Sequence, residues 1–134
     1  MTATTTDRNT PLKDGEIIAV PVAANTVIRA GVIVCVNAQG DAVEGSTAEN
    51  LTYLGRSEAS VDNTGGAAGA VVVQVRRGLM FQWANAADDP VTQALLGKPC
   101  YVEDNQTVAA TNGGNTRSPA GYVYGVDASG VWVL

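Results

Sequence analysis

Short runs that alternate between two apolar faces cover most of the chain after its first fourteen residues. In "TVIRAGVIVCVN", Val32, Val34 and Val36 fall on one face of an extended strand, and Ile33 and Cys35 fall on the other. Because both faces are apolar, this strand is expected to be covered on both sides.

A second long pattern is "AVVVQVRRGLMFQWAN", in which Val71, Val73 and Val75 share one face of a predicted strand. Beyond Gly78 an aromatic stripe continues the alternation. The stripe forms either the centre of the core or a contact between subunits, since aromatic residues and Met are enriched at interface centres. The candidates for these two roles are Leu79, Met80, Phe81, Trp83 and Trp132.

Turn residues divide the remaining apolar runs into short strands. "EIIAVPVAA" predicts an edge strand or bulge at Pro21, and "NAQGDAV" predicts a hairpin reversal. Further strands are predicted in "LTYLGRSEA", on both sides of "EDNQ", and on both sides of "DASG". The chain stops inside the last of these, so its C-terminus is expected to be tied into a sheet.

One stretch, "DDPVTQALLGK", predicts a helix of about two turns. Asp89 fits its N-cap, Pro90 its first turn, and Gly97 its C-terminal left-handed position. The predicted fold class is therefore all-β: a compact sandwich or small barrel of short antiparallel strands, with this one short helix.

The N-terminal segment differs from the rest. "MTATTTDRNTPL" is polar and rich in Thr, and it offers no hydrophobic face. We expect residues 1–14 to form a flexible arm and residues 15–134 to form a single β-rich domain. The arm is either a mobile terminus or a segment that becomes ordered on a partner, where threonines would suit added β-pairing.

The net charge and the reactive residues exclude several classes of function. The chain of 134 residues has 8 Lys and Arg, 13 Asp and Glu, and a formal net charge of −5, which argues against a nucleic-acid partner. It contains no histidine, so Ser–His and Cys–His systems are excluded. No apolar run is long enough to span a membrane, and no signal peptide is evident, so synthesis in a cytoplasm is expected.

The remaining reactive residues have structural explanations. We interpret Asp88–Asp89 as helix-capping acids, and Glu103–Asp104 as part of a solvated turn. Cys35 and Cys100 are expected to be buried thiols, and two cysteines without histidine are too few for a metal site. The chain is therefore not expected to be an enzyme, nor to bind a cofactor or metal.

Three stretches carry a resemblance: "AGVIVCVNAQGDAVEG", "YLGRSEASVDNTGGAAGAVVVQVRRG" and "GKPCYVEDNQTVAATNGGNTRSPAGYVYGVDASGVWVL". Their order resembles the decoration, or cement, proteins of tailed-bacteriophage capsids. The last stretch is similar to the family's closing pattern at Ala120–Gly121, Gly125–Asp127 and Gly130–Val133. The likeness covers most of the chain from Gly15 onward but not the arm.

The resemblance implies a non-enzymatic head protein on the outer surface of the expanded capsid, where it stabilises contacts between subunits of the major capsid protein. It also implies a homotrimer. On this hypothesis the arm reaches the capsid protein, through Thr4, Thr5, Thr6, Asp7, Arg8, Asn9, Thr10 and Pro11.

A different class stays open, namely a tail- or fibre-associated β-module that binds host glycans or joins fibre segments. Its candidate loops are "NGGNTR" and "EDNQT".

Overall fold

The computed structural model describes residues 2–134 and is all-β, as predicted. The described chain forms twelve strands and one short 3₁₀ turn, η1. In chain order they are β1 (Ile17–Pro21), β2 (Val27–Ile28), β3 (Ile33–Val36), β4 (Ala42–Glu44), β5 (Thr52–Ser57), β6 (Val61–Asp62), β7 (Val72–Arg76), β8 (Phe81–Asn85), η1 (Gln93–Leu95), β9 (Pro99–Val102), β10 (Thr107–Ala109), β11 (Pro119–Asp127) and β12 (Gly130–Val133).

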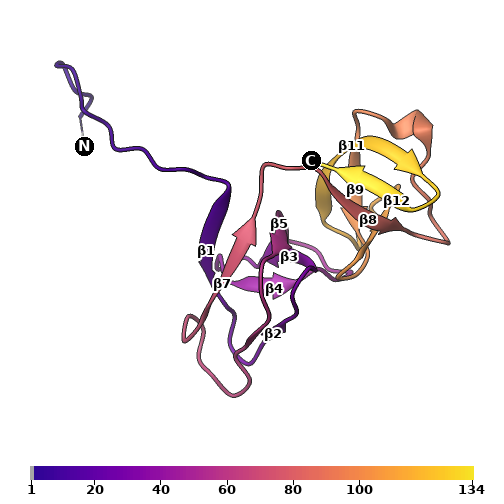
Figure 1. The fold of residues 1–134 in the computed structure, drawn as a ribbon, viewed down its shortest axis with the longest axis horizontal. Helices are drawn as coiled ribbons and strands as arrows, with labels where there is room; N and C mark the ends of the chain where they lie inside the picture. The colour runs from indigo at the N-terminus through magenta and orange to yellow at the C-terminus, as the bar shows by residue number, and fades with distance from the viewer. Residues whose placement is uncertain (1) are drawn as a thin grey trace.

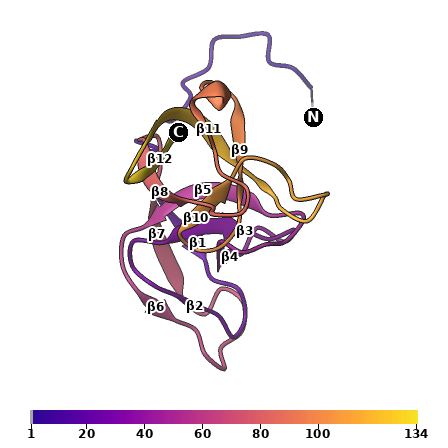
Figure 2. The ribbon, with the colours of Figure 1, turned by 90° about the vertical axis from the view of Figure 1, so that its right-hand side faces the viewer.

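The strands form two main bodies side by side (Figure 1). The N-terminal half builds a five-stranded sheet in the order β1-β7-β5-β3-β4. The C-terminal half closes a small barrel in the order β10-β8-β12-β11-β9. A two-stranded sheet of β2 and β6 lies at the end of the molecule away from the barrel (Figure 2).

Strand β3 lies between two separate hydrophobic cores. Ile33 and Cys35 belong to the barrel core, whereas Val34 belongs to the core of the five-stranded sheet. All three side chains are completely buried. The prediction that both faces of this strand are covered is confirmed, and the packing of its two faces joins the two halves of the chain.

The five-stranded sheet is nearly closed on itself. β1 is its edge strand, as predicted from Pro21, but the chain just past β1 turns toward the opposite edge. There Val22 forms a parallel bridge with Ala42, and the N–H of Ala23 donates to the carbonyl of Ala42 at 3.0 Å. Most of the sheet core is Val and Ile, because small β-branched side chains fill the narrow space between the two edges.

Polar contacts fasten the sheet to the barrel. Trp83 Nε1 in β8 donates to the hydroxyl of Tyr53 in β5 at 3.0 Å, and the Arg56 guanidinium lies 5.0 Å from the centre of the Phe81 ring. The Ser118 hydroxyl donates to the carbonyl of Ala48 at 2.7 Å. These bonds satisfy buried polar groups at the junction.

The predicted helix is wrong beyond its one 3₁₀ turn, Gln93–Leu95. Two bonds between the Asn85 side chain and the backbone of Val91, at 2.7 and 2.8 Å, hold the preceding segment against the barrel. Val91 is thereby buried in the barrel core. The segment therefore buries the Val91 side chain instead of forming the first turn of a helix. Gly97 does take the predicted left-handed conformation, with φ 80°.

The hairpins at the C-terminal end follow the prediction. β9 pairs with β10 and β11 pairs with β12, both antiparallel. One pairing differs from the expected antiparallel pattern, because β8 and β10 are parallel where they close the barrel. The last strand is tied in on both sides, since β12 lies between β8 and β11 and Leu134 exchanges two backbone bonds with Tyr122.

Closure of the barrel depends on a close approach at Gly130, where β12 begins. Its φ is 145°, and a Cβ atom there would lie 2.3 Å from the carbonyl oxygen of Trp83. We predict that Gly130→Ala lowers the free energy of unfolding by about 3 kcal/mol or more, because the backbone of β8 must move. Gly114→Ala is the control, since Gly114 has φ 72° with nothing within 4 Å, and its cost should be about 1 kcal/mol. Equal losses in urea titrations of the two variants would contradict this reading.

Candidate functional site

The two thiols of the chain are not accessible to solvent. Cys35 and Cys100 are free and fully buried in the barrel core, as predicted. Burial raises the pKa of each thiol to about 12. The pKa of the Tyr53 hydroxyl is also raised to about 12 by burial, against the opposing effect of the bond from Trp83. These groups are protonated at neutral pH and act as packing residues.

The acidic pairs take structural positions in the described chain. Asp89 accepts bonds from the backbone and hydroxyl of Thr111 at 3.0 and 2.6 Å, and from Arg117 at 2.9 Å. The Thr111 hydroxyl, helped by Arg117, holds the pKa of that carboxyl below its usual value. Asp89 is therefore not the predicted helix cap but the centre of a loop-joining cluster.

Arg117 completes this cluster by also bonding Glu103 at 3.2 Å. Asp104 behaves as predicted for a turn, because its carboxylate accepts from the N–H of Gln106 at 2.9 Å. In residues 2–134 no group of three or more His, Cys, Asp or Glu side chains could hold a metal ion. No helix in the same range is long and apolar enough to cross a membrane.

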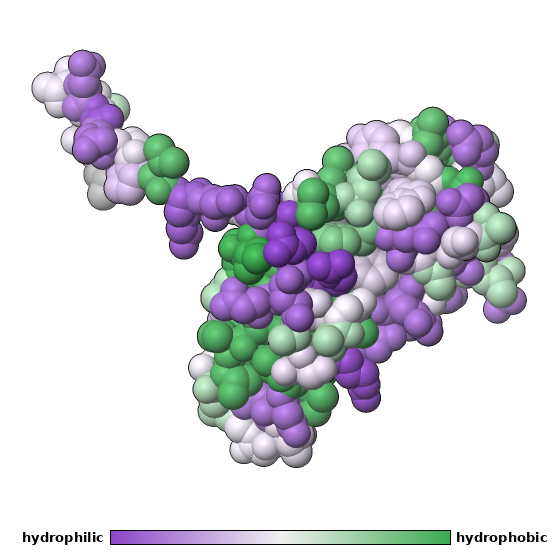
Figure 3. Space-filling model, in the orientation of Figure 1, coloured by the Kyte–Doolittle hydropathy of each residue, from purple (hydrophilic) through white to green (hydrophobic). Residues whose placement is uncertain are grey.

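The N-terminal arm extends away from the body in Figure 1. Residues 2–17 are all exposed, and residues 2–16 form no strand. The side-chain hydrogen bonds of the capsid-contact candidates join arm residues only, such as Thr4 to Thr6 and Arg8 to Thr10. Figure 3 shows the arm as mostly hydrophilic, with one hydrophobic stretch near its base. Flexibility of the arm in the free protein stays a prediction.

The base of the arm is anchored to the sheet. The N–H of Arg77 donates to the carbonyl of Glu16 at 2.8 Å, and the Arg77 guanidinium donates to the carbonyl of Gly15 at 3.4 Å. This anchor places the arm beside the connection from β7 to β8. That connection also lines the most apolar part of the barrel surface.

Outward-facing side chains of β11 and β12, the C-terminal residue after β12, and the connection before β8 form this surface. Alternation buries Phe81, Val133 and Val123 inside the barrel and leaves their neighbours in solvent. We call the exposed set the barrel outer face. It consists of Leu79, Met80, Tyr122, Tyr124, Trp132 and Leu134, which are 39–53% exposed.

Two hollows meet on the barrel outer face. One, of about 430 Å³, is lined by Gly78, Leu79, Met80, Tyr124 and Leu134. The other, of about 320 Å³, shares Leu79 and Leu134 and extends past Tyr122 to Arg77. The arm anchor therefore lies at the rim of an apolar depression. Single exposed apolar residues are ordinary, but a contiguous apolar surface marks an interaction site.

The structure places part of the aromatic stripe in the core and part at the surface, and a subunit contact of the exposed part stays a prediction. Phe81 and Trp83 lie in the core, 8% and 5% exposed, with ring centres 6.0 Å apart. Leu79, Met80 and Trp132 lie on the barrel outer face. Sequence reasoning missed Tyr122, Tyr124 and Leu134. Strict alternation around Val123 in "YVYG" would have placed both tyrosines outward.

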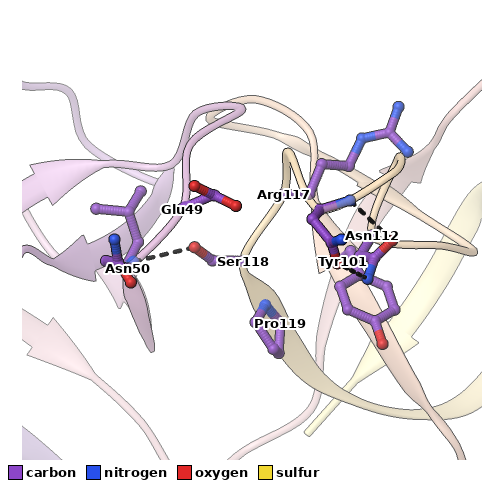
Figure 4. A pocket seen from close by; sticks show the side chains of 9 residues that line it. Glu49, Asn50, Tyr101, Asn112, Arg117, Ser118 and Pro119 are labelled. Carbon is purple, nitrogen blue, oxygen red and sulfur yellow. Dashed lines mark hydrogen bonds between the residues drawn. The ribbon is translucent and has the colours of Figure 1, made fainter.

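A third, polar hollow of about 420 Å³ lies at the junction of sheet and barrel. Figure 4 shows Glu49 and Asn50 on one side, Tyr101 and Asn112 on the other, and Ser118 between them. Asn112 bonds the side chain of Asn115 at 3.0 Å, so "NGGNTR" folds into a self-bonded turn along this hollow. The other loop considered for glycans, "EDNQT", is absent from its lining.

Comparison with protein-family models, curated proteins and solved structures found no match to this chain.

The Arg117 cluster generates a stability prediction. The Arg117 side chain is 14% exposed and joins two acids from separate loops. Arg117→Ala should lower the free energy of unfolding more than removal of an exposed arginine does, because the two part-exposed carboxylates lose the guanidinium that joins their loops. The control is Arg29→Ala: this arginine is 67% exposed, and its partner Glu44 keeps a second hydrogen bond from the Asn105 side chain at 2.7 Å, so the cost should be below about 0.5 kcal/mol. A loss no larger than that of the control in chemical denaturation would refute a stabilising role for the cluster.

The buried thiols generate a pH prediction. Unfolding returns the pKa of each thiol from about 12 to its ordinary 9.0. As the pH rises, the thiols of the unfolded chain therefore lose their protons at a lower pH than those of the folded chain. The stabilisation is full below pH 9 and is lost as pH rises from about 9 toward 12. We predict a falling free energy of unfolding over this window, with a shallower fall in the Cys35→Ala/Cys100→Ala variant, where only Tyr53 retains the effect. If the free energy of unfolding falls equally with pH in the two proteins, the buried thiols do not cause the fall.

The burial of the thiols also predicts that they are unreactive. In the folded wild type at pH 8, neither thiol should react with a thiol reagent.

Proposed function

We propose that this chain is a decoration, or cement, protein of a tailed-bacteriophage head, which binds the outside of the expanded shell and clamps neighbouring major capsid subunits. The supporting observation is the arm, exposed throughout and anchored firmly at its base. A free strand-like segment on a rigid domain suits a protein whose task is to hold another protein.

In this proposal the arm binds by adding a β-strand to a sheet of the capsid protein. Its backbone from Thr4 to Pro11 is exposed, so its N–H and C=O groups are available to an exposed sheet edge of a capsid subunit. Ordering the arm costs conformational entropy, which main-chain hydrogen bonds and threonine packing offset. This mode gives specificity for a sheet edge that exists only in one arrangement of the shell.

The charge of the chain fits a position outside the shell. A net charge of −5 disfavours contact with packaged DNA, which lines the inner surface. Binding selectively to the expanded shell stabilises that state by mass action, with no chemical step. Several copies acting together, as in a trimer, raise the effective concentration of each arm at its site.

The second candidate function is glycan binding by a tail or fibre module. The polar hollow favours it, because it combines the half-buried ring of Tyr101 with the carboxylate of Glu49 and the amide of Asn50. Aromatic faces and acid or amide groups are common partners of sugars. Retention of wild type, but not Tyr101→Ala, on immobilised host polysaccharide would support this function over cementing.

The capsid proposal is tested by co-sedimentation. Expanded heads of the phage that encodes this chain, prepared without the decoration gene, are mixed with wild type, a variant lacking residues 2–11, and a variant with residues 2–11 replaced by a Gly-Ser segment of equal length. We predict that wild type pellets with the heads and that both variants bind at least about tenfold more weakly, since the arm provides the grip.

The Gly-Ser variant is the matched control, because it keeps the length and polarity of the arm while removing its threonines. Binding of this variant equal to that of wild type would show that the arm is only a spacer. Failure of wild type to bind any expanded head would refute the cement function and favour the glycan alternative.

A further inference from the structure

The barrel outer face is large for a surface left in solvent. Tyr122, Tyr124 and Trp132 are 53%, 50% and 39% exposed. Because aromatic side chains have surfaces of about 150–250 Å², these three alone leave roughly 300 Å² exposed. Leu79, Met80 and Leu134, each about half exposed, add a similar area. The total is at the upper end of what a monomeric protein shows.

The same face is too small to hold two molecules together alone. A specific protein interface needs about 800 Å² from each partner, whereas this face offers roughly 600 Å². A stable contact between copies therefore needs a further apolar segment next to the face.

The base of the arm provides such a segment. Leu12 is 94% exposed, the highest value among the large apolar residues of the described chain. It lies three residues before Gly15, whose carbonyl contacts Arg77 at the rim of the apolar hollow. Three residues reach about 10 Å, so Leu12 is held within that distance of Gly15, which itself contacts Arg77 at the rim.

Leu12 does not occupy the hollow beside it, because the arm runs away from the barrel of its own molecule (Figure 1). Each molecule therefore presents a free leucine and an empty apolar hollow at adjacent points. This arrangement suits exchange between copies, in which each gives one arm base and receives another, as closed symmetry requires.

We propose that Leu12 of a second copy occupies the hollow between Leu79 and Leu134, and that the barrel outer faces are buried between copies. The proposal deepens the proposed function, since it assigns the contacts that join copies of the decoration protein. Residues 4–11 lie beyond Leu12 and are left free to reach the capsid.

Analytical ultracentrifugation of the full chain tests the proposal without capsids. Wild type should sediment as an oligomer at concentrations up to about 100 μM, and Leu79→Asp and Leu12→Asp should each weaken self-association about tenfold or more. Leu96→Asp is the matched control for the face, since Leu96 is 48% exposed and Leu79 is 47% exposed. Thr6→Asp is the control for the arm, and both controls should leave the oligomer intact.

A second measurement identifies the molecule that supplies Leu12. Single Leu12→Cys and Leu79→Cys variants are mixed and oxidised in air, while the native thiols stay buried. Disulfide-linked pairs of the two variants support the exchange. The exchange would be overturned if wild type is a monomer, or if neither Leu12→Asp nor Leu79→Asp weakens its oligomer. It would also be overturned if a disulfide forms only within one chain that carries both Leu12→Cys and Leu79→Cys.

The two proposals fail separately. A wild type that assembles but does not bind heads refutes the cement function and keeps the exchange. A wild type that binds heads while remaining a monomer in solution refutes the exchange and keeps the cement function.

Discussion

Burial of both faces of β3 is the constraint on which the rest of the structure depends. Ile33 and Cys35 belong to the barrel core, and Val34 belongs to the sheet core, so each core contains side chains of this one strand. Since adjacent residues serve different cores, a shift of one residue would move each side chain into the other core and disrupt the packing of both. The bond between Trp83 and Tyr53 fixes the same junction through polar groups. The two halves are therefore packed together through one shared strand, and the exposed arm extends from this body.

Because the interior is packed around β3, the proposed function has to be carried by the surface. The interior is filled with Val, Ile, Ala and two protonated thiols, and its buried polar groups serve turns and junctions. What remains free is the arm and the barrel outer face, which meet at Arg77. If the arm binds the capsid as proposed, its hydrogen bonds to Arg77 would transfer load from the arm to the sheet.

Much of the fold could be predicted from alternation. The double coverage of β3, the hairpins at Asn37–Asp41 and Asp127–Gly130, and the buried thiols follow from local pattern. The helix prediction failed because its capping signals are local, whereas the burial of Val91 is set by the barrel. The parallel β8–β10 pair was also out of reach, since it joins strands distant in sequence. The barrel outer face was found only in part, because its residues come from separate segments of the chain and Tyr122 and Tyr124 were not assigned a face.

The most direct test of the cement function is DNA retention by heated heads. Filled heads lacking the decoration protein are incubated with or without purified wild type, heated in steps, and treated with nuclease to measure released DNA. If the protein clamps the shell, wild type should raise the temperature of DNA release, and the variant lacking residues 2–11 should not. Release at the same temperature with saturating wild type would contradict the clamp, even if the protein remained bound to the heads.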